Sequence, residues 1–149
     1  MERWVSCEHS NVAKLVGRTV LDSSPAIVSE WYSSGNIADY LKDNPHADRK
    51  YLLLDAAKGL QYLHSRVPPI CHGDIKGSNV LIKYDGRAAI CDFGLAQVLD
   101  EEFERLASQT IHRGTIRWTS PERLDDNGPL TPSSDVWSWA WLIWEVRQI

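Results

Sequence analysis

The distribution of apolar and polar positions predicts short strands at the start of the chain. Residues 12–20 are mostly compatible with a strand that is broken at Gly17, and residues 26–31 form a second short strand. The turn-forming sequence Leu-Asp-Ser-Ser-Pro at 21–25 separates these two segments. We therefore expect an antiparallel pair of strands in this part of the chain.

Helical spacing of apolar residues dominates the middle of the chain. A short helix is predicted over 37–42, and a longer one over 48–66 carries an apolar face that consists of Leu53, Ala56, Ala57, Leu60 and Leu63. Asp48 is well placed to favour the N-terminal end of the longer helix, because a negative charge there interacts well with the helix dipole. Pro68 and Pro69 prevent the helix from continuing.

Two further short strands, 80–83 and 88–91, enclose the sequence Tyr-Asp-Gly-Arg at 84–87. Because Asp-Gly is a strong hairpin signal, these strands should pair in an antiparallel hairpin. The segment from 92 to about 122 then shows little regular pattern, and such a long irregular segment is usually functional or disordered. Pro121 is suited to start a short helix.

The last predicted helix begins near Ser133 or Ser134 and has Asp135 in its first turn. From Val136 onward it is apolar on nearly every side, so we expect it to be buried all round. Four of the seven tryptophans of the chain fall between Trp137 and Trp144, and core packing is the expected role for them. The apolar run is too short to span a bilayer.

Composition and charge narrow the class of protein. With 149 residues, 43% hydrophobic and 24% charged, the chain has the length of one globular domain and enough apolar material for a core. Its net charge of -4 gives no reason to expect nucleic acid or an anionic membrane as partner. The three widely spaced cysteines indicate reduced thiols rather than a disulfide framework or a zinc site. These features, without an apolar leader, indicate a cytoplasmic protein.

Two polar clusters carry the candidate chemistry: His-Gly-Asp-Ile-Lys-Gly-Ser-Asn at 72–79 and Asp-Phe-Gly at 92–94. The predicted hairpin between them would fold back and bring Asp74, Asn79 and Asp92 close together. Carboxylate and amide oxygens are the ligands that Mg²⁺ prefers, and Mg²⁺ neutralises the phosphates of ATP during phosphoryl transfer. The pattern therefore favours a site for phosphoryl transfer.

Each polar residue of these clusters suits one part of that chemistry. Asn79, through its amide oxygen, and Asp92, through its carboxylate, can supply ligands to magnesium. Asp74 can accept the proton of an attacking hydroxyl and orient it. Lys76 can reach the transferring phosphate and stabilise its charge.

The order and spacing of three motifs resemble those of eukaryotic protein kinases, whose pattern is H-R-D-L-x-x-x-N, then D-F-G, then A-P-E. The corresponding residues here are His72-Gly73-Asp74 with Asn79, Asp92-Phe93-Gly94, and Ser120-Pro121-Glu122. Lys76 and the pair Gly114-Thr115 resemble the Ser/Thr-specific form. The chain is most similar in character to the tyrosine-kinase-like Ser/Thr kinases.

The resemblance implies an α+β, protein kinase-like fold that is incomplete at both ends. Residues 1–29 would be a remnant of the small-lobe sheet, residues 30–34 the hinge, and residues 35–149 an incomplete, mainly helical large lobe. The central helix of the large lobe would start at the sequence Asp-Val-Trp-Ser, and its Asp135 would tie down the backbone of the catalytic loop.

The resemblance also implies an activity, its cofactors and its site residues. The family transfers the γ-phosphate of ATP to Ser or Thr of protein substrates with Mg²⁺ as cofactor, typically in signal transduction. The implied roles are, in this numbering, the catalytic base Asp74, the phosphate-stabilising Lys76, the magnesium ligands Asn79 and Asp92, and the adenine-binding hinge residues Glu30, Trp31 and Tyr32. His72 is expected to have a structural role beneath the two loops.

The chain departs from the family pattern at several points. Gly73 replaces an arginine that, in the family, often pairs with a phosphorylated residue of the activation segment, which puts activation through Ser108, Thr110 or Thr115 in doubt. A Gly-rich G-x-G-x-x-G loop and a strand lysine of the V-A-I-K type are both missing from the sequence. Lys14 follows a Val-Ala pair but lies too close to the hinge to be the ATP-anchoring lysine.

These departures leave a second function open: a non-catalytic kinase-like fragment that acts as an interaction module. Without covering helices, the tryptophans of the last helix would form an apolar patch through which the chain could self-associate. A third alternative is a fragment that needs further segments in order to fold. The intact Asp74, Asn79 and Asp92 favour the enzyme.

Overall fold

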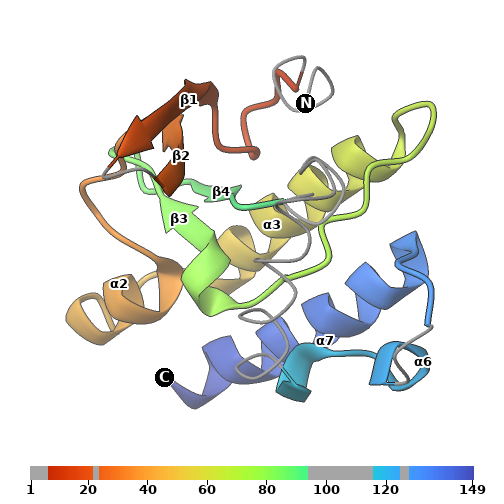
Figure 1. Cartoon of the computed structure of the whole chain (residues 1–149). Coiled ribbons are helices and arrows are strands. Elements are labelled where there is room, and N and C mark those ends of the chain that lie inside the picture. The colour runs from red at the N-terminus through yellow and green to blue at the C-terminus, as the bar shows by residue number, and fades with distance from the viewer. Residues whose placement is uncertain (1–6, 22–23, 94–115, 125–127) are drawn as a thin grey trace.

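The computed structural model describes residues 7–21, 24–93, 116–124 and 128–149 (Figure 1). The described residues form a mixed α+β structure with two separate two-stranded antiparallel sheets, and the expected fold class is confirmed. Gly94 and the candidate phosphorylation sites Ser108, Thr110 and Thr115 lie outside the described residues.

The first sheet contains β1, Leu15–Leu21, paired with β2, Ser24–Ser29, as predicted. The register is irregular between Leu15 and Gly17, where the sequence indicated a break. The strand begins later than predicted, because Val12 forms a parallel bridge with Ile90 of the second sheet instead. Residues just before β1 therefore connect the two sheets.

Two helices follow, and a polar side chain caps each of them. Helix α2, Ile37–Asp43, is capped by Asn36, whose side chain accepts a hydrogen bond from the N–H of Asp39. Helix α3, Arg49–His64, is capped by Asp48, which accepts hydrogen bonds from the first backbone N–H groups of the helix. The expected position of Asp48 at this end is thus confirmed.

The predicted hairpin is also present. Strand β3, Val80–Ile82, pairs with β4, Ala88–Ile90, so that Val80 stands opposite Ile90. Gly86 in the connecting turn has φ +77°, a conformation that glycine adopts without strain. A single 3₁₀ turn, η1 at Gly77–Asn79, leads directly into β3. The hairpin thus joins the ends of the two polar clusters.

The last described elements are the 3₁₀ turn η2, Ile116–Trp118, the short helix α6, Pro121–Leu124, and the long helix α7, Pro132–Gln148. Thr131 and Ser134 form a capping box that fixes the start of α7. The prediction that α7 is buried all round is wrong. Only one stripe along it is buried: Ser134, Asp135, Ser138, Leu142 and Val146.

The tryptophans of α7 explain this correction. Trp137 and Trp144 remain 42% and 48% exposed, whereas Trp139 packs partly against the core. The buried stripe of α7 carries the packing against the core, whereas Trp144 contacts the ring of Trp141 and the guanidinium group of Arg117 and stays half exposed. An apolar sequence can predict that a helix has buried positions, but the packing partners decide which faces are covered.

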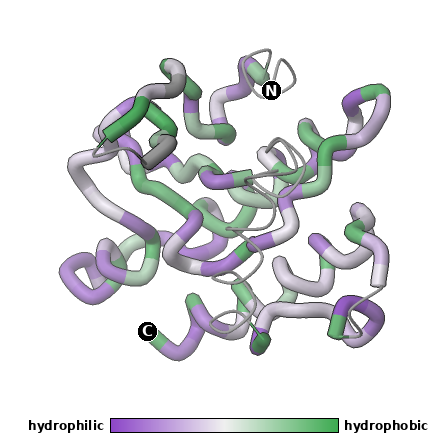
Figure 2. Tube along the Cα trace, in the orientation of Figure 1, coloured by the Kyte–Doolittle hydropathy of each residue, from purple (hydrophilic) through white to green (hydrophobic). Residues whose placement is uncertain are grey.

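The main core includes residues of α3, α7 and the β3–β4 hairpin. Figure 2 shows the hydrophobic positions along the backbone of these elements. Its largest fully buried side chains come from helices, strands and loops and include Ile37, Leu63, Ile75, Ile90, Phe93 and Leu142. Among the residues described, no helix combines the length and the hydropathy required to cross a membrane.

Candidate active site

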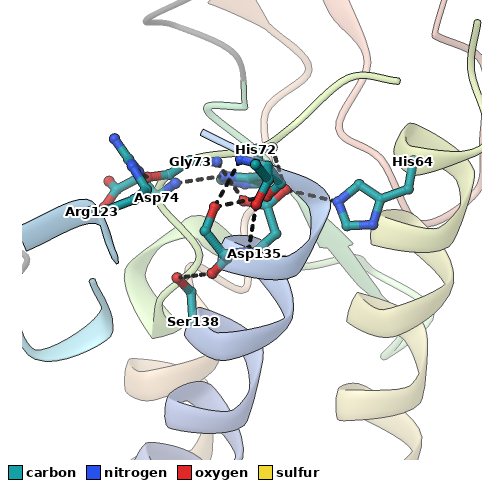
Figure 3. Close-up of polar contacts among 9 residues, drawn as sticks. His64, His72, Gly73, Asp74, Arg123, Asp135 and Ser138 are labelled. Atoms are coloured by element: carbon teal, nitrogen blue, oxygen red, sulfur yellow. Dashed lines mark hydrogen bonds and ion pairs between the residues drawn. The ribbon is translucent and has the colours of Figure 1, made fainter. Parts of the chain in front are cut away.

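The loop at 72–79 is anchored by Asp135 in the first turn of α7 (Figure 3). The Asp135 carboxylate is 1% exposed and accepts hydrogen bonds from the N–H groups of His72, at 2.7 Å, and Gly73, at 2.8 Å. His64 from the end of α3 contacts the same carboxylate at 2.8 Å. The expectation that Asp135 ties down the backbone of this loop is confirmed.

Asp74, Lys76 and Asn79 are in direct contact within this anchored loop. The Nζ of Lys76 lies 2.6 Å from Oδ2 of Asp74, and the Nδ2 of Asn79 donates to the same oxygen at 2.9 Å. Asn79 also donates to the backbone carbonyl of Asp74 at 2.7 Å. The other carboxylate oxygen, Oδ1 of Asp74, is buried without a hydrogen-bond partner in the described structure.

His72 supports the loop from beneath. Its side chain is 3% exposed, its ring lies 6.2 Å from the ring of Phe93, and its Nδ1 accepts a hydrogen bond from the N–H of Asp74 at 3.2 Å. Burial lowers the pKa of His72, and this influence outweighs the nearby carboxylates, which act in the opposite direction. The imidazole is therefore neutral at physiological pH, which agrees with the structural role expected for it.

Asp92 reaches the site from the end of β4. The N–H of Cys91 donates to the carbonyl of Asn79 at 2.9 Å, so the backbone that precedes Asp92 is tied to the loop. Asp92 is exposed and has φ +58°, an uncommon conformation for a residue with a side chain. Burial, followed by the charge of Asp92, raises the pKa of the Cys91 thiol, so this cysteine stays protonated.

A second carboxylate from α7 holds the other end of the loop. Oε2 of Glu145 accepts hydrogen bonds from the N–H of Gly77, at 2.9 Å, and from the indole N–H of Trp118, at 3.0 Å. A Cβ atom on Gly77 would lie only 2.6 Å from Oε1 of Glu145, so a larger residue here would displace the Glu145 carboxylate. Glu145 thereby links the loop to η2, which precedes the Ser-Pro-Glu motif.

The predicted hinge lies apart from these contacts. Trp31 is 88% exposed, whereas the side chain of Tyr32 is buried and packs with Ala13, Ala89 and Cys91. The N–H of Glu30 donates to the carbonyl of Lys14 at 3.1 Å, which places Lys14 beside the hinge with an exposed side chain. Tyr32 thus connects the hinge to Cys91, the neighbour of Asp92.

Three residues of the site were not predicted as functional: His64, Arg123 and Glu145. His64 contacts Asp135, Arg123 donates from Nη1 to the carbonyl of Gly73 at 3.2 Å, and Glu145 holds Gly77. Each contact joins residues at least 50 positions apart in the sequence. No local pattern indicates such a contact.

The donor set of this site suits a magnesium ion. Asn79 offers Oδ1, which among the described residues accepts a long 3.3 Å hydrogen bond from Ser78, and Asp92 offers an exposed carboxylate. In the described ranges no three His, Cys, Asp or Glu side chains converge on one point.

Comparison with known proteins agrees with the resemblance. The family model described as "Protein tyrosine and serine/threonine kinase" matches residues 2–149. A "Probable serine/threonine-protein kinase drkD" of Dictyostelium discoideum is 37% identical over 142 residues, which are 93% of this chain and 11% of that protein. "Serine/threonine-protein kinase CTR1" of Arabidopsis thaliana is 33% identical over 147 residues, which are 95% of this chain and 17% of that protein.

A mouse relative gives the same result. "Serine/threonine-protein kinase TNNI3K" of Mus musculus is 34% identical over 146 residues, which are 93% of this chain and 17% of that protein. The chain therefore spans less than one fifth of the length of these three relatives.

Proposed function

Because this chain belongs to the family of protein tyrosine and serine/threonine kinases, we propose that it carries the catalytic loop of an enzyme that transfers the γ-phosphate of ATP to Ser or Thr of protein substrates. The observation that carries the proposal is the contact of Asp74 with Lys76 and Asn79 inside a loop whose backbone is held by Asp135. The names of the relatives support Ser and Thr as acceptors.

In this proposal Asp74 is the catalytic base. Its Oδ2 is held by Lys76 and Asn79, so the carboxylate has a fixed orientation. Its Oδ1 has no hydrogen-bond partner among the described residues and is the oxygen that would accept the proton of the substrate hydroxyl. A buried acceptor without a partner costs free energy, which a donating hydroxyl would recover.

Lys76, Asn79 and Asp92 would handle the phosphates. Lys76 neutralises Asp74 in the structure described, and its ammonium group would stabilise the charge of the transferring phosphate. Asn79 and Asp92 would hold Mg²⁺, which, when bound, neutralises the negative charge of the phosphate oxygens. The backbone of Glu30, Trp31 and Tyr32 would bind adenine, and the domain boundaries at 30–34 and 35–149 stay predictions.

The buried ring of Tyr32 bears on nucleotide binding. It packs against Cys91, whose neighbour is the proposed magnesium ligand Asp92. An adenine bound along the hinge would therefore lie beside this ring. Cys7, Cys71 and Cys91 are buried and form no disulfide, as is usual for proteins of a reducing compartment. We therefore propose that the protein acts in the cytoplasm, in a signalling role.

The test of this proposal is transfer of labelled phosphate from ATP to a general protein substrate in the presence of Mg²⁺. Asp74→Asn should reduce kcat by roughly 100-fold or more, because a general base contributes about that factor. Asp39→Asn, at an exposed carboxylate on α2, is the matched control and should retain full activity. Equal activity of the wild type and Asp74→Asn would contradict the proposed role of Asp74.

The exposed tryptophans of α7 favour a second candidate function, a non-catalytic interaction module. Trp137 and Trp144 are seven positions apart and therefore lie on the same side of the helix, opposite the buried stripe. If this is the function, the chain should self-associate in a concentration-dependent manner and show no phosphotransfer. Sedimentation of the wild type and Trp137→Lys distinguishes the two candidates, because only a module that uses this side becomes monomeric on substitution.

A further inference from the structure

The backbone at Gly73 has a conformation that contacts from outside the loop must stabilise. Its φ is +84°, which glycine adopts freely and other residues adopt at a cost. A Cβ atom at this position would lie 3.1 Å from Cδ2 of Leu130, so the site is also crowded. Glycine thus satisfies the geometry, but it leaves the backbone with more alternative conformations than any other residue would.

The peptide unit between Gly73 and Asp74 is held at both of its polar ends. Its carbonyl, on Gly73, accepts a hydrogen bond from Nη1 of Arg123 at 3.2 Å, and its N–H, on Asp74, donates to Nδ1 of His72 at 3.2 Å. Because a peptide unit is planar, these two bonds fix the orientation of the unit and of the Cα atom of Asp74. Arg123 and His72 are therefore the side chains that orient this peptide unit in the described residues, whereas Lys76 and Asn79 hold the Asp74 carboxylate.

The position in which Arg123 contacts Gly73 costs free energy. In the part of the chain that the structure describes, Nε of Arg123 is buried without a hydrogen-bond partner. A buried donor without an acceptor is unfavourable and is uncommon in folded proteins. The hydrogen bond to Gly73 is the interaction that this arginine gains in return.

From these contacts we infer that Arg123 is a positioning residue for Asp74. It holds, from α6, the peptide unit that a glycine at 73 would otherwise leave free to rotate. In this role Arg123 would act through the backbone of Gly73 and not by contact with the substrate hydroxyl or ATP. The inference rests on the proposed function for its effect on catalysis, but not for its effect on the loop.

Amide hydrogen exchange measures the effect on the loop without any need for activity. In Arg123→Met, which keeps the apolar stem and removes the donors, the N–H of Asp74 should exchange about tenfold faster, as expected for the loss of one hydrogen bond. The N–H of Gly77, which Glu145 holds, should be unaffected. Arg123→Lys, which retains a donor, should recover part of the protection, and Arg147→Met, at an exposed site, should match the wild type.

Phosphotransfer by the same variants tests the link to catalysis. Arg123→Met should lower kcat about tenfold and leave the KM for ATP unchanged, because the nucleotide contacts lie elsewhere. Unchanged exchange at Asp74, or equal acceleration at Asp74 and Gly77, would overturn the inference, since Arg123 would then be dispensable or merely stabilising. If Arg123→Met does not fold, amide exchange in Arg123→Lys decides. The inference is overturned if the N–H of Asp74 exchanges as slowly as in the wild type. It is also overturned if the N–H groups of Asp74 and Gly77 lose their protection together.

A chain without phosphotransfer activity gives a different result. If the wild type transfers no phosphate but exchange at Asp74 responds as expected, the proposed function fails for this chain and the positioning role of Arg123 stands. If the wild type is active and kcat is unchanged in Arg123→Met, the positioning role fails and the proposed function stands.

Discussion

The catalytic loop and the β1–β2 hairpin lie on opposite sides of the predicted hinge and are held in place by different means. Charged side chains from α6 and α7 form hydrogen bonds with the backbone of the loop. Asp135, which accepts hydrogen bonds from the N–H groups of the loop, is 1% exposed. The hairpin is held by its strand pairing and by Leu15 and Ile27, which pack partly against the core. Its other apolar residues Val16 and Val20 are each 66% exposed. An isolated two-stranded hairpin is marginally stable in water.

The charge-assisted hydrogen bonds of this fold are concentrated around the loop at 72–79. The elements that would handle the proton and the metal are fixed by buried, charge-assisted hydrogen bonds. The strands on the other side of the hinge have few such contacts among the described residues. We therefore expect substitutions to have large effects around the loop and small effects in the hairpin.

The largest effect is expected for Asp135→Asn. Both carboxylate oxygens of Asp135 accept hydrogen bonds from backbone N–H groups. In the asparagine variant, the amide NH₂ group would replace one of these oxygens and would face a backbone N–H. The free energy of unfolding should fall by about 3 kcal/mol, as for buried donors that lose a charged acceptor. Urea unfolding measures this loss, and the exposed Asp39→Asn should be silent. A loss no greater than that of Asp39→Asn would mean that Asp135 does not hold the loop.

A somewhat smaller loss of unfolding free energy is expected for Asp55→Asn. This variant changes the core beneath the loop and leaves the loop itself unchanged, so it distinguishes the two contributions. The buried Asp55 accepts from Nε of Arg87 at 2.7 Å, from Nη2 of Arg87 at 2.6 Å, and from the N–H of Ala88 at 3.1 Å. Burial acts to raise the pKa of Asp55, but these hydrogen bonds outweigh it and hold the pKa below its ordinary value. The loss should be about 2 kcal/mol at pH 7.

The pH dependence of this loss has a definite sign. A carboxyl group with a lowered pKa stabilises the folded state above its ordinary pKa, and this contribution disappears as the pH falls through the lowered value. The difference in stability between the wild type and Asp55→Asn should therefore shrink from pH 7 to about pH 2. A difference that grows on acidification would contradict the assignment.

Gly77→Ala should have a moderate and local effect. The new Cβ would lie 2.6 Å from Oε1 of Glu145, so the Glu145 side chain must move and weaken its bond to the indole of Trp118. We expect a loss of roughly 1–2 kcal/mol and a shifted indole N–H resonance of Trp118. Because the two residues are in contact, Gly77→Ala and Glu145→Gln should be less than additive. If the two losses of unfolding free energy were strictly additive, Gly77 and Glu145 would not act as a unit.

The smallest effect is expected in the hairpin, at Val20→Thr. Val20 is 66% exposed in β1, and substitutions at exposed positions usually change stability by less than about 0.5 kcal/mol. Urea unfolding of this variant provides the direct contrast with Asp135→Asn. A loss comparable to that of Asp135→Asn would mean that another surface covers this strand.

The sequence predicted those parts of the fold that depend on local chemistry. Asp48 caps α3, and the Asp85-Gly86 turn forms its hairpin, because capping and turn geometry involve neighbouring residues. Burial along α7 could not be predicted from its composition. Trp137 and Trp144 are exposed because burial depends on which other elements pack against each side of a helix.

The site divides in the same way. The motif spacing placed Asp74, Lys76 and Asn79 in one loop, and the structure brings their side chains into contact. Arg123 and Glu145 were not predicted, because their contacts with the loop span 50 and 68 residues and leave no local pattern. The proposed roles of these residues in binding and catalysis stay predictions.

Thermal unfolding with and without ATP and Mg²⁺ tests the central claim most directly. A ligand that binds only the folded chain at about ten times its Kd adds about 1.4 kcal/mol of stability, which raises Tm by roughly 4 °C for a chain of this size. We expect such a rise for the wild type and its loss in Asp92→Asn. A cooperative transition with no rise, or an equal rise in Asp92→Asn, would contradict a metal-dependent nucleotide site at Asp92.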